Sequence, residues 1–378
     1  MAAALMVVIL AFTAFTVDLG YIALTKTQLQ AAADGSVLAA GLEMGDGFGA
    51  TAVSASTVLS AGAGAAQSVA AVHKNGDLSS TYLNTSRDIR FGTLSWNGES
   101  HVWRETWGAS PYNLVEVTLV RGQNNSTDSE TGTPLGDQQL PLFFGPIIGN
   151  SAARVSVSAK AALLPAAGIS VPPGGTAPVL PMAVDLASWE DLMNNIGSDN
   201  YSYDPNTGSV TSGSDGIMEL NIFPDGDAEL PPGNRGTVSF GDPGDNSTGT
   251  LERQIVEGLN AYDMSFYTNN EISLDGGPFE VYGNPGISAG IEDELISVIG
   301  QFRIAALFTT AAGNGSNTTY TVVRWVASRI MAVDFGEKPK YVYVQPASFV
   351  MKNAVRVKGG DLAEIRDDTI FAPLFLYK

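Results

Sequence analysis

The opening of the chain, residues 1–17, carries no charged side chain. At about 1.5 Å of rise per residue, a helix of this length covers about 25 Å. A bilayer core of about 30 Å takes roughly 20 apolar residues. Leu19 to Leu24 supply the remainder, with Asp18 as the one charge in the stretch. The segment therefore predicts a short membrane helix in which Asp18 lies near an interface or is paired, because charge inside a membrane is costly.

A cleaved signal peptide and a buried core helix are the alternatives. A signal peptide has a basic leader and a cleavage site. Here no basic residue precedes the apolar run, and helix-forming residues continue past it without a proline before Pro111. We interpret the helix as retained. Because basic residues normally lie on the cytoplasmic side of a membrane helix, we also expect that a basic leader is missing from the numbered chain.

The run from Val17 to Glu43 resembles the N-terminal signature of the TadG-like (TadE/G-like) proteins of tight-adherence pilus systems. In that family an apolar helix leads into Asp-Leu-Gly, an aromatic residue, a polar turn, Leu-Gln and an Ala-Ala-Ala-Asp tract. The matching positions here are Asp18-Leu19-Gly20, Tyr21, Thr25 to Thr27, Leu29-Gln30 and Ala31 to Asp34. The resemblance implies a role in a pilus system. Type IV pilins, however, usually have a Glu five residues into the helix, and this chain has Leu5.

Small residues on a helix let neighbouring helices approach closely. Such residues occur both in the apolar run and beyond it: Ala2, Ala3, Ala4, Ala11 and Ala14, then Ala31 to Ala33, Ala39 and Ala40. They predict assembly of the helix with copies of itself. The alternative interpretation is that alanine only promotes helix formation.

Composition narrows the possible functions. The formal net charge is −19, which disfavours nucleic acid as a partner because phosphate backbones are repelled. The chain has no cysteine, so disulfides and thiolate chemistry are excluded, and its two histidines, His73 and His101, are too few for a three-histidine metal site. The 42 glycines and 19 prolines favour a turn-rich β protein outside the cytoplasm.

The patterning predicts five regions. They are an N-terminal membrane or assembly helix over 1–44, a second Ala-rich helix within 45–76, a β-rich region over 77–167, a Pro/Gly linker over 168–180 and a mixed α/β region over 181–378. Glycines at 45–49 break the first helix, and the second, over 50–73, is expected to pack antiparallel to it. Strands are predicted at 88–96, 101–106, 113–120, 154–164, 218–223, 303–308, 320–334 and 341–345, and short helices at 187–196, 250–260 and 288–299. In the first of these helices, Ser188 and Asp191 have the spacing of a capping box.

Two acidic loops are the best candidates for a ligand. Asp225 and Asp227 lie in one, and Asp242 and Asp245 in the other, on glycine-containing backbone. Calcium takes six to eight oxygen ligands of this type. We therefore consider calcium a possible ligand, with solvated turns as the alternative, and expect no other cofactor.

The string Gly-Ile-Ser-Ala-Gly at 286–290 has the form of a hydrolase nucleophile elbow. In the α/β-hydrolase order, the catalytic histidine follows the serine along the chain. Both histidines here precede Ser288. We expect Ser288 to cap a helix instead, and we predict no catalytic residue and no enzymatic activity.

These observations predict an α+β fold, with a long N-terminal apolar helix, a helical hairpin and a mostly antiparallel, β-rich ectodomain that has short helices. The predicted function is that of a structural cell-surface protein, a pilus-like filament subunit assembled through its N-terminal helix. Copies of itself, and the membrane during assembly, are the expected partners. The alternatives are a membrane-anchored TadG-like adhesin or assembly accessory protein that does not form the filament, and an extracytoplasmic hydrolase.

Overall fold

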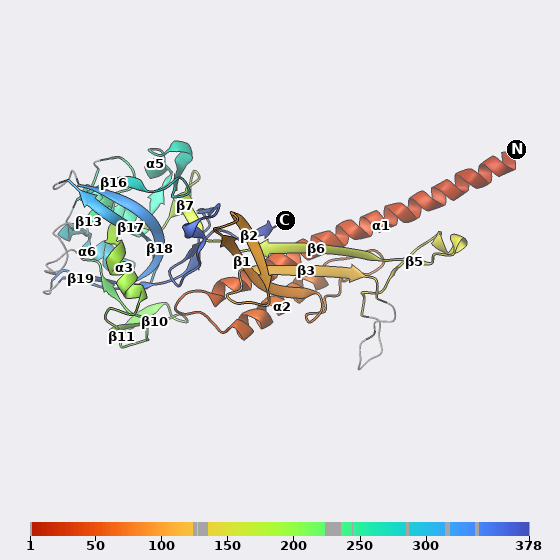
Figure 1. Ribbon diagram of the computed structural model, residues 1–378, viewed down its shortest axis with the longest axis horizontal. Helices are drawn as coiled ribbons and strands as arrows, with labels where there is room; N and C mark the ends of the chain where they lie inside the picture. Colours follow the sequence, from red (N-terminus) through yellow and green to blue (C-terminus); the bar gives the residue numbers. More distant parts are fainter. Residues whose placement is uncertain are drawn as a thin grey trace.

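The computed structural model describes residues 2–123, 127, 135–223, 236–243, 245–284, 287–313, 318–336 and 340–377. The molecule is elongated, with helix α1 (Ala2–Glu43) leading from a free N-terminal end into the body (Figure 1). A proximal sheet lies along the second half of α1, and a larger distal sheet lies beyond it (Figure 1). The predicted α+β fold, with its long apolar helix, short helices and antiparallel sheets, is confirmed.

Helix α1 turns back into α2 (Ala55–Ala71) through the 3-10 turn η1 (Met44–Gly47). The α2 helix begins five residues later than predicted because Ser54 is its N-cap, with the Ser54 hydroxyl accepting from the Thr57 amide. The two helices run antiparallel, as predicted. Gly35 faces Val69, whereas Gly62, nearer the start of α2, faces the Ala40 carbonyl oxygen.

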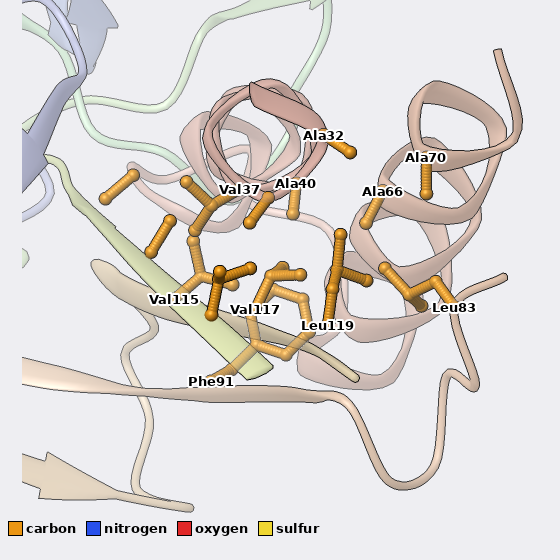
Figure 2. Packing of buried hydrophobic residues seen from close by; sticks show 14 of the residues in the cluster. Ala32, Val37, Ala40, Ala66, Ala70, Leu83, Phe91, Val115, Val117 and Leu119 are labelled. Carbon is orange, nitrogen blue, oxygen red and sulfur yellow. The ribbon is translucent and has the colours of Figure 1, made fainter. Parts of the chain in front are cut away.

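The proximal sheet has the strand order β2-β1-β3-β6-β23, and all its pairs are antiparallel. Its strands are β1 (Ile89–Asn97), β2 (Val102–Trp107), β3 (Leu114–Arg121), β6 (Val155–Ala162) and β23 (Phe375–Tyr377). Val115, Val117 and Leu119 are buried on alternate positions of β3 and pack toward α1 and α2 (Figure 2). The strand predicted at 113–120 is confirmed, and its buried residues alternate.

The distal sheet has the strand order β12-β19-β18-β16-β13-β9-β17, and β17 also pairs with β18. Its strands are β9 (Val179–Asp185), β12 (Leu220–Asn221), β13 (Gly236–Ser239), β16 (Phe279–Asn284), β17 (Phe302–Ala312), β18 (Thr318–Asp334) and β19 (Tyr341–Pro346). The long strand β18 pairs with β17, β16 and β19, so that β18, β16, β13, β9 and β17 close into a ring. Within this sheet β9 and β17 are parallel.

Short helices and strands complete the fold. The helices are α3 (Leu186–Met193), α4 (Thr248–Glu257), α5 (Ala261–Met264), α6 (Glu292–Ser297), and the 3-10 turns η2 (Gly145–Ile148), η3 (Thr268–Asn270), η4 (Ala289–Ile291) and η6 (Asp361–Ala363). The remaining strands are β4 (Leu140–Pro141), β5 (Ala152–Ala153), β7 (Ala166–Ser170), β8 (Thr176–Ala177), β10 (Tyr201–Asp204), β11 (Ser209–Ser212), β14 (Leu259–Asn260), β15 (Glu271–Ser273), β20 (Phe349–Val350), β21 (Ala354–Arg356) and β22 (Ile370–Phe371).

Two local features differ from the sequence-based expectation. The N-cap of α3 is Asp185, which accepts from the Ser188 amide, so the capping box expected at Ser188 and Asp191 is wrong. The chain leaves β9 at Asp185 and enters the helix there directly. The range 168–180, predicted as a linker, contains most of β7, all of β8 and the start of β9, and Ile169 and Val171 are buried in it.

Candidate functional site

The first half of α1, up to Leu24, is exposed on most of its surface. Nine of its large apolar side chains are 44–69% exposed: Leu5, Met6, Ile9, Leu10, Phe12, Phe15, Val17, Leu19 and Leu24. Over Ile9–Gly47 the helix is long and apolar enough to cross a membrane, and only 11% of its most apolar stretch is buried. Such a surface has a large hydrophobic driving force to leave water.

The second half of α1 is packed inside the chain. Ala32, Ala33 and Ala40 are fully buried against α2 and the proximal sheet (Figure 2). Small residues are needed at this contact because the helix backbones are close: a Cβ added at Gly62 would lie 3.2 Å from the Ala40 carbonyl oxygen. The expectation that these three alanines contact other copies is therefore wrong. They are buried inside one chain, against α2 and the proximal sheet.

A second element lies beside the exposed half of α1. We call it the finger, defined as residues 140–153. Its base is the pairing of β4 with β5, in which Leu140 lies opposite Ala153, and its tip is the turn η2 (Figure 1). Gly145 allows the tip to close, because a Cβ there would lie 2.1 Å from the Asn150 carbonyl oxygen. The finger has no charged residue.

Asp18 joins the finger to α1. Its carboxylate accepts hydrogen bonds from the Phe143 amide at 2.9 Å and the Phe144 amide at 3.1 Å, and Asp18 is only 6% exposed. The ring of Tyr21, one turn along α1, lies 5.0 Å from the ring of Phe143. The sequence predicts that Asp18 lies near an interface or is paired. The structure shows pairing, and the partners are backbone amides.

Between the finger and α1 lies an apolar groove of about 750 Å³. One wall comes from α1 between Leu10 and Asp18, and the other from Phe144, Ile147 and Ile148. Ile147 and Ile148 are 80% and 70% exposed. The sequence interpretation missed this element, although the uncharged run Leu-Phe-Phe-Gly-Pro-Ile-Ile at 142–148 was a visible signal.

The predicted calcium ligands are only partly described. Asp225 and Asp227 lie outside the described residues. Asp245 accepts from the Ser247 amide and the Thr250 hydroxyl, and hydrogen bonds from these two residues lower its pKa. Asp242 contributes its carbonyl oxygen to a bond from Ser239. Among the described residues, no group of three or more potential ligands gathers. Calcium binding stays a prediction.

Ser288 caps the turn η4, as predicted, by accepting from the Gly290 amide at 3.3 Å. Its hydroxyl lies 3.2 Å from that of Thr248. Within the part of the chain that the structure describes, no hydrogen bond joins Ser288 to a histidine. His101 lies instead at the turn between β1 and β2, beside Trp96.

Comparison with known proteins identifies a similarity in the first helix. Residues 1–43 match the model of the Flp pilus-assembly TadE/G-like family, which covers the whole of α1. No curated protein and no solved structure matches the chain. This match and the exposed apolar helix together support a membrane-anchored protein of the cell envelope with a pilus-related role. Residues 1–43 are therefore similar to the TadE/G-like Flp pilus-assembly family, and they are followed by a larger β-rich region.

Proposed function

We propose that this chain is a structural, non-enzymatic component of a pilus-assembly apparatus, anchored in the membrane by the first half of α1. The observation that carries the proposal is the contrast within that helix. Its exposed half presents large apolar side chains over most of its surface away from the finger, whereas its second half is built into the proximal sheet and α2. Because α1 is continuous, a membrane around its first half would hold the folded part of the chain at a fixed distance from the bilayer.

A filament subunit is the second candidate, and the exposed apolar helix also favours it. Copies of α1 packed in a bundle would remove the same surface from water. Two observations favour the anchor. The finger occupies the Asp18 side of α1, where a neighbouring helix would otherwise pack. Ala32, Ala33 and Ala40 are buried within the chain, so they do not offer a surface to a second copy.

Cell fractionation tests the proposal. Cells expressing the full chain are sheared to release surface filaments, and their membranes are washed with carbonate. The anchor predicts that the chain stays with the membranes and is released only by detergent. Recovery of the chain along the length of sheared filaments would instead establish the filament subunit.

A pair of charge substitutions sharpens this test. Leu10→Arg puts a charge near the middle of the apolar run, at a cost of about 2.5–3.5 kcal/mol for membrane insertion. We expect much less of this variant in the carbonate-washed membranes. The matched control is Val102→Arg, which adds the same charge to an exposed position of β2 and is expected to leave membrane retention unchanged.

A further inference from the structure

We propose that the tip of the finger, residues 143–148, is a second membrane-contacting element, whose apolar side chains enter the boundary between headgroups and acyl chains beside α1. This inference rests on the proposed anchoring of α1. It adds that the β-rich region touches the membrane at a defined place, through residues more than a hundred positions away in the sequence.

Position along α1 is the first argument. The finger is fixed at Asp18 by two hydrogen bonds and reaches along the groove as far as Leu10. Eight residues of helix correspond to about 12 Å. The tip therefore lies beside the apolar part of α1, and a membrane that covers Leu10 to Phe15 meets the tip at the same depth.

The burial of Asp18 is the second argument. A carboxylate on a helix in water needs no cover, because water solvates it. Near lipid, an ionisable side chain is stable only when it faces protein and its polar atoms are paired. The finger provides this arrangement, because two backbone amides bond the carboxylate and the finger leaves Asp18 only 6% exposed.

The backbone of the tip is the third argument. Irregular backbone does not lie exposed in the hydrocarbon core of a membrane, so an irregular loop enters only the membrane edge, and amides that leave water there must be paired within the protein. Most amides of residues 142–150 are paired: Leu142 donates to Ser151, Phe143 and Phe144 to Asp18, Ile147 to Phe144, Gly149 to Pro146 and Asn150 to Gly145, while Pro146 has no amide hydrogen. The side chains that remain exposed at the tip are apolar, with Ile147 and Ile148 foremost.

Lipid accounts for these features better than a second copy of the chain. The tip has no Trp, Tyr or Arg, the residues that most often anchor protein partners, and no charged residue. Its apolar surface is continuous with that of α1, which the proposed anchor places in lipid.

The chain contains no cysteine, so each introduced cysteine is a unique labelling site. We would place a nitroxide on the full chain at Ile148→Cys in the tip, Leu10→Cys on α1 or Ile196→Cys, an exposed isoleucine of the distal region. Each variant is reconstituted in phosphatidylcholine vesicles, a lipid chosen because it carries no net charge to repel an acidic protein. Collisions with oxygen and with a water-soluble nickel chelate are then measured.

The inference predicts that the labels at Ile148 and Leu10 collide more with oxygen, and the label at Ile196 more with nickel. A lipid-exposed Leu10 with a water-exposed Ile148 would overturn the inference and leave the anchor intact. Water exposure at both would overturn the anchor itself. A label at Ile148 that is shielded from both reagents, and freed by dilution in lipid, would show that a second copy covers the tip, which also overturns the inference.

Asp18→Ala tests separately whether the two hydrogen bonds at Asp18 hold the finger beside α1. Loss of the two hydrogen bonds is expected to increase the mobility of the label at Ile148, whereas Leu10 stays in lipid. The control is Thr16→Ala, because the Thr16 hydroxyl bonds only to carbonyls of its own helix. Unchanged mobility in Asp18→Ala would show that these bonds do not hold the finger in place.

Discussion

The two halves of α1 share leucine and alanine but have different surroundings. Leu10 in the first half is 62% exposed, whereas Leu29 in the second half is 1% exposed. Both halves contain several alanines, and the second half also carries Lys26, Asp34 and Glu43. The difference arises because α2 and the sheet strands β3 and β6 cover only the second half. A leucine is thus a core residue in the second half, whereas in the first half it is a surface residue available to lipid or protein.

Matched leucine substitutions are expected to show the largest difference between the halves. Leu29→Ala removes a fully buried side chain and is expected to lower the free energy of unfolding by about 2–5 kcal/mol. Leu10→Ala is expected to change it by less than about 0.5 kcal/mol, because its side chain packs on no core. Urea unfolding in detergent, followed by tryptophan fluorescence, measures both. Equal losses would contradict the division of the helix.

A pair of glycines in α2 tests the close contact that holds the second half. In Gly62→Ala the new Cβ meets Phe91 Cζ at 2.9 Å and the Ala40 carbonyl oxygen at 3.2 Å. Overpacking of this kind costs about 1–3 kcal/mol, which is expected to exceed the gain in helix propensity.

The control for this contact is Gly64→Ala on the same helix, where nothing lies within 4 Å of the new Cβ. It is expected to stabilise the protein by about 0.5–1 kcal/mol, since alanine is the better helix former. Thermal unfolding shows whether each variant is more or less stable than the unsubstituted protein. If both were stabilising, the α1–α2 contact would be looser than the structure indicates.

The smallest expected effect concerns a single bond from α1 to the loop after α2. The Gln28 side-chain oxygen accepts from the Gly76 amide at 2.7 Å. Gln28→Ala is expected to cost about 0.5–1.5 kcal/mol. The neighbouring Thr27→Ala serves as its control, because the Thr27 hydroxyl bonds only within α1, to Ala23. Chemical denaturation resolves this difference, and an unchanged midpoint for Gln28→Ala would show that the bond adds nothing to stability.

Local patterns predicted much of the fold. The alternating residues at 113–120 predicted the strand β3, and the glycines after Glu43 predicted the end of α1. Ser288 was identified as a helix cap. Each of these predictions depends on residues within a few positions of one another, which is the range over which periodicity and capping act.

Features that depend on distant parts of the chain were not predicted. The ring closed by β18 requires one strand to pair with three others, and no local pattern indicates that. The finger was missed because its apolar run is too short to have a helical or strand period. Its importance comes from the helix beside it, which lies 125 residues earlier in the chain at Asp18.

By itself, the sequence determined that this protein begins with an apolar helix whose first 17 residues are uncharged, that this segment is TadE/G-like, and that a β-rich remainder without cysteine chemistry follows. Only the tertiary structure decided which alanines are buried in the chain's own core and which part of α1 stays exposed. It also decided that Asp18 is paired with the finger. The reason is physical: composition and period act over a few residues, whereas burial is decided by whichever distant segment packs against a given face.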